Sequence, residues 1–277
     1  LGFKHNFAKP NKDITADLNY SASRNNGNTL INTQYFDDLG NPKTDLFRQI
    51  TKNNGNTKNL IVQTDFTNPI TQNIKLEAGL RGAVRTNESK NENFMSNSAT
   101  GDFISLKALD SRYKFNDQVY AGYITYSQKL NNFSYQLGGR IESSFYKGEL
   151  IDSNQVFSNK YPFSFFPSVF LTQKINDNQD IQLNYTRKIN RPNFFQLIPY
   201  YDFTDSLNIS KGNPGLKPEF TNLVELSYQL NLKNGNNIVT TAYYRNTNDL
   251  ITRYTYRDLN PNNAAADSIF ISSFTNA

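Results

Sequence analysis

Side chains able to act as bases, nucleophiles or metal ligands are few in this sequence. His5 is the only histidine and cysteine is absent, so a Ser-His-Asp arrangement would have to be built on His5, and no thiolate is available. The run Asp177-Asn178-Gln179-Asp180 lacks the glycine and the distal glutamate of a calcium-binding loop. Asp37 and Asp38 have no partner base nearby in the sequence. We therefore predict that the chain is not an enzyme, with no catalytic residue, no metal site and no cofactor.

Charge and hydropathy narrow the class of protein further. The net charge is +5, and the basic residues are spread along the chain, so we do not expect nucleic-acid binding. The mean hydropathy is -0.66, and no apolar run is long enough for a membrane helix. A low mean also suits a transmembrane β-barrel, because only about half of each strand faces lipid while the lumen and loops are wet.

Short polar connections alternate with long polar segments along the chain. The short ones contain Asn, Asp, Gly or Pro, which are turn-forming residues, and lie at 9–12, 68–72, 131–132, 176–179 and 233–236. The long ones lie roughly at 24–57, 87–116, 148–161, 190–217 and 257–267. We interpret asparagine-rich stretches such as 53–56 as turns or mobile external segments. Short turns at one end and long loops at the other are typical of an outer-membrane barrel.

The segments between these connections alternate in polarity, as strands with one apolar face do. In 74–86 one face would carry Ile74, Leu76, Ala78, Leu80, Gly82 and Val84, and the other Lys75, Glu77, Gly79, Arg81, Ala83 and Arg85. The segments 14–23 and 133–147 alternate in the same way, with Arg140 and Glu142 on the polar side. Several segments reach the roughly 9–11 residues that a tilted strand needs to cross the hydrocarbon layer.

These patterns predict an all-β fold, an antiparallel up-and-down transmembrane β-barrel surrounded by outer-membrane lipid. We count about ten to eleven strands in residues 1–277, which would form part of one barrel domain. The chain starts inside a strand pattern without a signal peptide and ends in the entering strand 268–277, so we expect a fragment that is closed by strands elsewhere. The water-filled lumen would be lined by Lys75, Glu77, Arg81, Arg85, Arg140 and Glu142.

Two motifs resemble those of a known family. GNPGLKPE at 212–219, followed by Glu225, Leu226 and Tyr228, is similar to the GNP-x-LKPE and E-L-x-Y pattern of TonB-dependent outer-membrane receptor barrels. RKINRPNFFQLIP at 187–199 and TAYYRNTNDLI at 241–251 resemble the Bacteroidetes branch of these barrels. The likeness is most specific from residue 185 to the end of the chain.

We expect the motif residues to be structural, turning a loop back into a strand. They are Arg191, Pro192, Gly212, Asn213, Pro214, Leu216, Lys217, Pro218 and Glu219. The run Asn213-Pro214-Gly215-Leu216 suits a type II turn, with glycine accepting a positive φ at the third position. Pro218 favours an extended backbone at the residue before it.

The resemblance implies a function that the residues alone do not give. It implies a bacterial outer-membrane receptor that takes up a scarce ligand (siderophore, vitamin, glycan or peptide), with a plug and a link to the TonB complex supplied by an N-terminal region outside this sequence. Loops 24–57, 87–116 and 190–217 would help to capture the ligand. Two alternatives remain open. One is a surface or secretion-associated outer-membrane barrel without transport, and the other is a soluble all-β binding protein.

Overall fold

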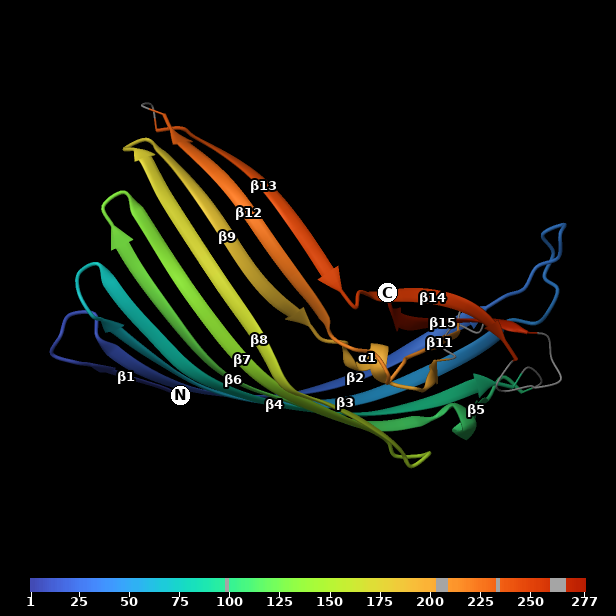
Figure 1. The fold of residues 1–277 in the computed structure, drawn as a ribbon. Helices are drawn as coiled ribbons and strands as arrows, with labels where there is room; N and C mark the ends of the chain where they lie inside the picture. The colour runs from blue at the N-terminus through green and yellow to red at the C-terminus, as the bar shows by residue number, and fades with distance from the viewer. Residues whose placement is uncertain (98–99, 203–208, 233–234, 260–267) are drawn as a thin grey trace.

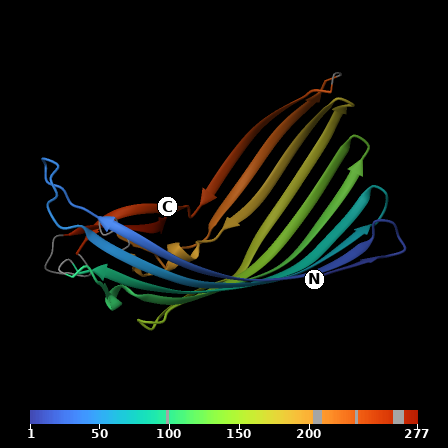
Figure 2. The same cartoon turned by 180° about the vertical axis from the view of Figure 1, so that it is seen from behind.

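The computed structural model describes residues 1–97, 100–202, 209–232, 235–259 and 268–277. A broad curved sheet of eleven strands dominates it, and all neighbouring strands that are consecutive along this sheet are antiparallel (Figures 1 and 2). In spatial order they are β1 (Gly2–Asn6), β2 (Asp13–Thr33), β3 (Phe47–Pro69), β4 (Ile74–Ser96), β6 (Ser111–Leu130), β7 (Phe133–Leu150), β8 (Gln155–Asn176), β9 (Gln179–Asn190), β12 (Glu219–Asn231) and β13 (Asn237–Asn248), with β5 (Phe103–Ser105) paired to β4. The sheet curves like the wall of an open barrel, which confirms the predicted fold class.

A second, smaller layer lies on the concave side near one end of the sheet (Figure 1). It contains α1 (Phe194–Leu197) and a four-stranded sheet in the order β10-β11-β15-β14. These strands are β10 (Tyr201–Asp202), β11 (Ile209–Lys211), β15 (Ile269–Asn276) and β14 (Ile251–Asp258). We call the described residues of 191–218 and 251–276 the shelf, and the end of the large sheet that carries it the shelf end.

The shelf is held to the wall by the main apolar core. Leu197 and Leu216 of the shelf are fully buried against Phe115 of β6 and Tyr146 of β7. Phe194 packs at the edge of this cluster, with its ring centroid 5.0 Å from that of Phe115. Burying these side chains stabilises the position of the shelf inside the curve of the sheet, because their apolar surface is removed from water there.

Two adjacent rows of paired residues show how the two faces of the sheet differ. One row runs Gln63, Arg81, Ala121, Glu142 and Ser164 across β3, β4, β6, β7 and β8. The next row, on the opposite face, runs Thr64, Leu80, Gly122, Ile141 and Phe165. The first row shares its face with the core under the shelf, so it is concave. The second row is convex, and its large apolar side chains are exposed.

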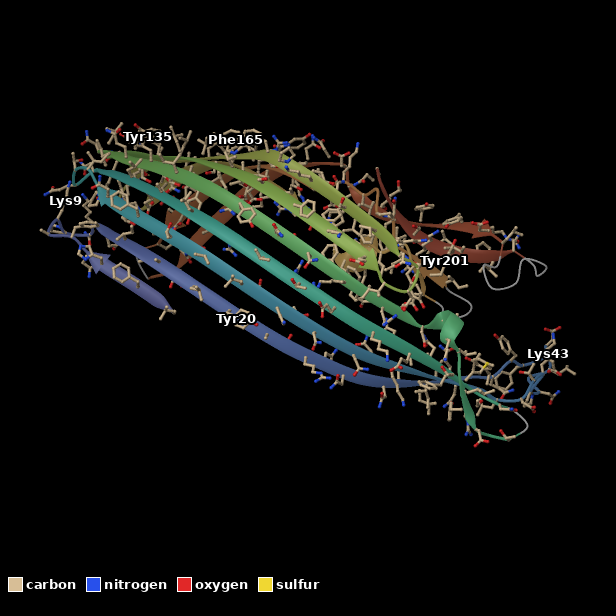
Figure 3. All side chains as sticks on the ribbon, turned by 90° about the horizontal axis from the view of Figure 1, so that it is seen from below. Lys9, Tyr20, Lys43, Tyr135, Phe165 and Tyr201 are labelled. Carbon is tan, nitrogen blue, oxygen red and sulfur yellow. The ribbon has the colours of Figure 1, made fainter. Side chains whose placement is uncertain are left out.

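The short turns lie at the end of the sheet opposite to the shelf end. They connect strands at 7–12, 70–73, 131–132 and 177–178, close to the predicted positions; the predicted turn 233–236 has residues 233–234 outside the described ones. Figure 3 shows Lys9 of the first turn and Lys43 of the β2–β3 connection at opposite ends of the sheet. Asn11 and Asn131 have positive φ angles of 58° and 45°, which asparagine tolerates better than most residues.

Three of the predicted long loops are largely strand. β2 and β3 pair continuously from Asp13–Thr67 to Thr33–Phe47, so the predicted loop 24–57 shrinks to 34–46. The asparagine-rich stretch 53–56 lies inside β3 and pairs with both β2 and β4. Likewise, 87–116 contracts to 97–110, which holds β5 and the 3-10 helix η1 (Lys107–Leu109), with 98–99 outside the described residues. The strands therefore continue beyond the apolar band, by which we mean the part of the sheet where apolar and polar side chains alternate.

The β7–β8 connection breaks the predicted alternation of short and long connections. Only residues 151–154 separate the two strands, and Asn154 has a φ of 54°. The predicted loop 148–161 was wrong, since most of it is paired strand. A β-bulge follows between the pairs Ser144–Tyr161 and Glu142–Ser164. Between these pairs β8 has two residues, Pro162 and Phe163, whereas β7 has one. This bulge moves the concave positions of β8 from odd to even numbers.

Of the other two predicted loops, 190–217 contains α1, β10 and β11, with 203–208 outside the described residues. The predicted loop 257–267 connects β14 to β15, and 260–267 likewise lies outside the described residues. β15 enters where the sequence pattern predicts a strand, and it pairs with β14 in the shelf.

Candidate functional site

The concave face carries the polar side chains that the sequence assigns to a lumen. All six predicted lumen residues bond to close neighbours on the sheet. Lys75 bonds to Glu77 at 3.0 Å, and Arg85 bonds to Asp117 at 3.0 Å. Each of these pairs is substantially exposed, so it contributes little to stability. Arg81 donates to Gln63 on β3 at 3.3 Å.

Next to this row is a second polar group centred on Tyr123 of β6. Its hydroxyl donates to Asp65, and the guanidinium of Arg140 lies over its ring at 5.5 Å. Gly79 leaves the space for this ring, because a Cβ there would come within 2.6 Å of the carbonyl oxygen of Thr64 and would overlap the end of the Tyr123 side chain. The concave wall is therefore a closely packed polar surface.

The most buried charge on this wall is Glu142 of β7. It accepts from Arg140 Nε at 2.6 Å and from Arg191 Nη2, and Arg191 Nε also donates to Ser144 Oγ at 3.3 Å. Arg191 is the first residue of the shelf. One buried carboxylate between two arginines therefore joins the wall to the shelf, with charge-assisted hydrogen bonds, which are the stronger kind.

The first half of the GNPGLKPE motif ties the shelf together. Gly212 N–H donates to the carbonyl of Ile198 at 2.9 Å, and any Cβ at Gly212 would overlap the Ile198 backbone. Asn213 Nδ2 donates to the carbonyl of Phe274 on β15 at 2.9 Å, and its Oδ1 accepts from Gly215 N–H at 2.9 Å. Leu216 is fully buried.

The turn formed by Asn213, Pro214, Gly215 and Leu216 is not type II. Gly215 does not have a positive φ, whereas a type II turn requires one at this position. The asparagine side chain takes over instead: it holds the Gly215 N–H in an Asx-turn, and the Leu216 N–H reaches the Asn213 carbonyl at 3.3 Å. Side-chain capping of this kind replaces the need for a left-handed glycine.

The second half of the motif joins the shelf to β12. Lys217 exchanges backbone hydrogen bonds with the side chain of Asn276, at 2.8 and 3.0 Å, and Pro218 is fully buried. Glu219 is also buried; its carboxylate accepts from Ile251 N–H at 2.6 Å and from Asn190 Nδ2 at 2.7 Å. These bonds hold the bend where β13 passes into β14.

A helix that the sequence prediction missed lies between Pro192, which is buried, and the motif. Asn193 and Gln196 form a reciprocal capping box around α1, at 3.0 and 2.9 Å. The spacing Asn-x-x-Gln was the available signal for it. The helix displays Phe195, whose ring is exposed.

Beside the apolar core, a cavity of about 490 Å³ lies between the shelf and the wall. Its wall side comes from β2, β3, β4, β6 and the last residue of η1. Its shelf side comes from α1, β10, β11, β14, β15 and the residues beside them. The lining residues are Thr29, Thr51, Asn53, Asn91, Asn93, Leu109, Tyr113, Phe195, Ile198, Tyr200, Asp202, Ser210, Lys211, Gly212, Arg253 and Phe274. Sequence reasoning did not find this cavity, because its residues come from segments far apart in the chain.

Tyr200 closes one side of the cavity. Its hydroxyl donates to the carbonyl of Leu109 at 2.7 Å, and burial raises its pKa above the ordinary value. The phenol is therefore neutral at physiological pH and serves as a hydrogen-bond donor. Among the residues that the structure describes, no group of three His, Cys, Asp or Glu side chains is arranged to hold a metal ion.

Comparison with protein families decides the class of this chain. The family described as "Outer membrane protein beta-barrel family" matches residues 5–277. The chain belongs to this family. Its place is therefore the bacterial outer membrane, where the convex row with Leu80, Ile141 and Phe165 faces lipid. In the described part of the chain, no helix has the length and apolar character needed to cross a membrane.

Solved structures show which barrels share this fold. The chain resembles the copper transporter OprC (TM-score 0.62, 12% identity, 99% of this chain and 41% of that one) and the ferric-catecholate import receptor Fiu from K12 E. coli (0.60, 12%, 99% and 42%). It also resembles FpvA of P. aeruginosa, solved with pyoverdines (0.59, 13%, 98% and 35%). These are barrels of the TonB-dependent receptor type, and the chain spans about two fifths of their length or less. No curated protein matches the chain.

Proposed function

We propose that this chain forms part of the barrel wall of a TonB-dependent receptor that takes up a scarce ligand across the outer membrane. The observation that carries the proposal is the pairing of two opposite faces within one sheet. The convex face is apolar, and the concave face combines a bonded polar wall with a cavity beside the shelf. Surfaces of this kind suit a lipid-embedded wall around a path for a polar ligand.

In this proposal the six charged wall residues line the ligand's path, and the motif residues keep the shelf in place. Lys75, Glu77, Arg81 and Arg85 lie on β4, and Arg140 and Glu142 on β7. The contacts of Asn213, Leu216 and Glu219 support the structural role, since each is used within the protein. The plug and the region that engages the TonB complex would belong to the rest of the protein.

The similar structures include transporters of copper and of ferric catecholate and a receptor bound to pyoverdines. Their identities to this chain are 12–13%, so they support uptake as the class of function while siderophore, vitamin, glycan and peptide remain candidate ligands. A surface or secretion-associated barrel without transport is the rival function.

Growth of a strain lacking the gene tests the proposal. Wild-type, gene-deleted and tonB-deleted cells would be grown with iron chelates, cobalamin, oligosaccharides or peptides as the limiting nutrient. We expect the gene deletion to reduce growth on one nutrient class at limiting but not at high concentration, and the tonB deletion to reduce it equally. Unimpaired growth of the gene-deleted strain on every nutrient would favour the non-transporting rival.

A further inference from the structure

Five amide or hydroxyl side chains supply most of the wall side of the cavity beside the shelf. They are Thr29 of β2, Thr51 and Asn53 of β3, and Asn91 and Asn93 of β4, and Leu109 and Tyr113 complete this side. None of them is charged. The cavity volume of about 490 Å³ lies within the range of roughly 300–1,000 Å³ found for pockets that bind small organic ligands.

These polar groups are held in fixed positions by one another. Thr51 Oγ1 donates to Asn93 Oδ1 at 3.0 Å, and Asn53 Nδ2 donates to Asn91 Oδ1 at 2.5 Å. Asn91 Nδ2 in turn donates to Ser111 Oγ at 3.1 Å. An amide oxygen accepts more than one hydrogen bond, so these cavity-lining side chains keep acceptor capacity for a ligand. Pre-ordering of this kind lowers the entropic cost of binding a polar ligand.

An aromatic side chain of the shelf also lines this cavity. Phe195 lines the cavity with 72% of its surface exposed, although Phe194 beside it packs into the core. The capping box of α1 fixes the short helix that carries it. An exposed ring in the same cavity as a row of amides offers dispersion contact to the C–H face of a sugar, and the amides can bond the sugar's hydroxyl groups.

The charges of the lining do not favour a highly anionic ligand. They are Asp202, Lys211 and Arg253. The ammonium group of Lys211 already bonds the Tyr201 hydroxyl at 3.1 Å and lies 4.3 Å from the centre of that ring. One carboxylate and two basic groups leave a single net positive charge beside five uncharged wall side chains.

We propose that this cavity binds an uncharged, hydroxyl-rich ligand, namely a segment of a neutral oligosaccharide. The inference rests on the proposed uptake function and narrows its ligand class. Phe195 provides the stacking surface, and the amides of Asn53 and Asn91 form hydrogen bonds with the hydroxyl groups of the ligand. The ligand class thus differs from the metals and metal chelates named for the similar structures.

Binding to the purified full-length protein in detergent tests this inference. The probes are an array of neutral and acidic oligosaccharides, followed by calorimetry with the best neutral oligosaccharide, ferric citrate and a ferric catecholate. We expect a neutral oligosaccharide to bind. Phe195→Ala should weaken its affinity about two- to twelvefold, since an aromatic contact contributes about 0.5–1.5 kcal/mol and 1.4 kcal/mol corresponds to tenfold.

Phe163→Ala is the matched control, because Phe163 is also an exposed phenyl, at 66%, and lies outside the cavity lining. Its affinity should equal that of the wild type. Asn53→Ala should weaken binding about two- to tenfold through the loss of a hydrogen-bonding group. The inference is overturned when no neutral oligosaccharide binds, when a ferric chelate binds instead, or when Phe195→Ala binds as tightly as Phe163→Ala.

Uptake by cells separates this inference from the proposed function. If the purified protein binds an oligosaccharide that cells do not take up in a TonB-dependent way, the result supports the ligand class inferred for the cavity and contradicts the proposed transport. If cells take up a ferric chelate in a TonB-dependent way and the protein binds no oligosaccharide, the result supports transport and contradicts the inferred ligand class.

Discussion

Replacing Glu142 with glutamine removes the charge that joins the wall to the shelf. The side chain is 8% exposed and accepts from Arg140 at 2.6 Å and from Arg191. Glutamine has nearly the same shape and keeps one acceptor oxygen, but its NH2 group cannot accept a hydrogen bond. Glu142→Gln therefore leaves one guanidinium without its acceptor and two positive charges without the anion between them.

The contacts give a size for this effect. Hydrogen bonds to charged groups contribute about 1.5–3 kcal/mol each, and removing one partner of a fully buried ion pair costs about 3–5 kcal/mol. The side chains of Arg140 and Arg191 are 32% and 25% exposed, so water partly solvates them and the lower range applies. We expect a loss of about 2 kcal/mol in the free energy of unfolding, roughly 30-fold in the equilibrium constant.

Denaturant unfolding of the full-length protein in lipid vesicles measures this loss. Glu77→Gln is the matched control, because Glu77 lies on the same concave face in an exposed pair with Lys75; it should change the unfolding free energy by less than about 0.5 kcal/mol. Proteolysis in the native state should also cut the shelf faster in Glu142→Gln. Equal unfolding free energies for the two variants would refute the role assigned to Glu142.

Substitutions at Glu219, Gly79 and Asp37, with a control at Gly82, test other parts of the account. Glu219→Ala leaves the Ile251 N–H without its acceptor, and should lower the unfolding free energy by about 1–3 kcal/mol, whereas Glu219→Gln, which retains an oxygen, should lose less; equal losses would contradict this. Gly79→Ala should cost about 1–3 kcal/mol through overpacking, while Gly82→Ala, whose nearest neighbour would be 3.5 Å away, should behave like the wild type in the same unfolding assay. Backbone hydrogen bonds, chiefly that from Asn41, lower the pKa of Asp37. The ionised carboxylate should therefore keep the 34–46 connection ordered at pH values above the ordinary pKa of aspartate, and this order should be lost as the pH falls through the lowered pKa of Asp37. Hydrogen exchange of this connection should show the pH dependence in the wild type and not in Asp37→Asn.

The strands in the apolar band could be predicted from the sequence, because one face meets lipid and the other meets water. In β4, Leu80 and Arg81 alternate as this difference requires. Beyond the band both faces are wet, so the alternation disappears although the pairing continues. Asn54 and Gly55 therefore read as a turn, but they lie in the middle of β3 between two paired strands.

The structural use of the motif could be predicted in outline but not in detail. Proline and glycine in GNPGLKPE indicated a turn into a strand, and Glu219 does begin β12. That Asn213 would form the Asx-turn, and that Glu219 would accept from Ile251, depend on contacts between distant segments. The cavity depends on such contacts as well, since α1 faces strands more than 100 residues earlier in the chain.

The central claim is that the convex face of the sheet meets lipid and the concave face meets water. Measuring the accessibility of single side chains on the two faces to reagents in lipid and in water tests this claim most directly. The sequence contains no cysteine, so spin labels can be attached to single cysteines at Leu80 and Ile124 on the convex face and at Arg81 and Thr125 on the concave face, with the full-length protein in outer-membrane vesicles. We predict that oxygen dissolved in lipid relaxes the first two labels and a water-soluble nickel chelate the second two. Similar access of both reagents to neighbouring positions such as 80 and 81 would contradict a lipid-facing wall around a water-filled path.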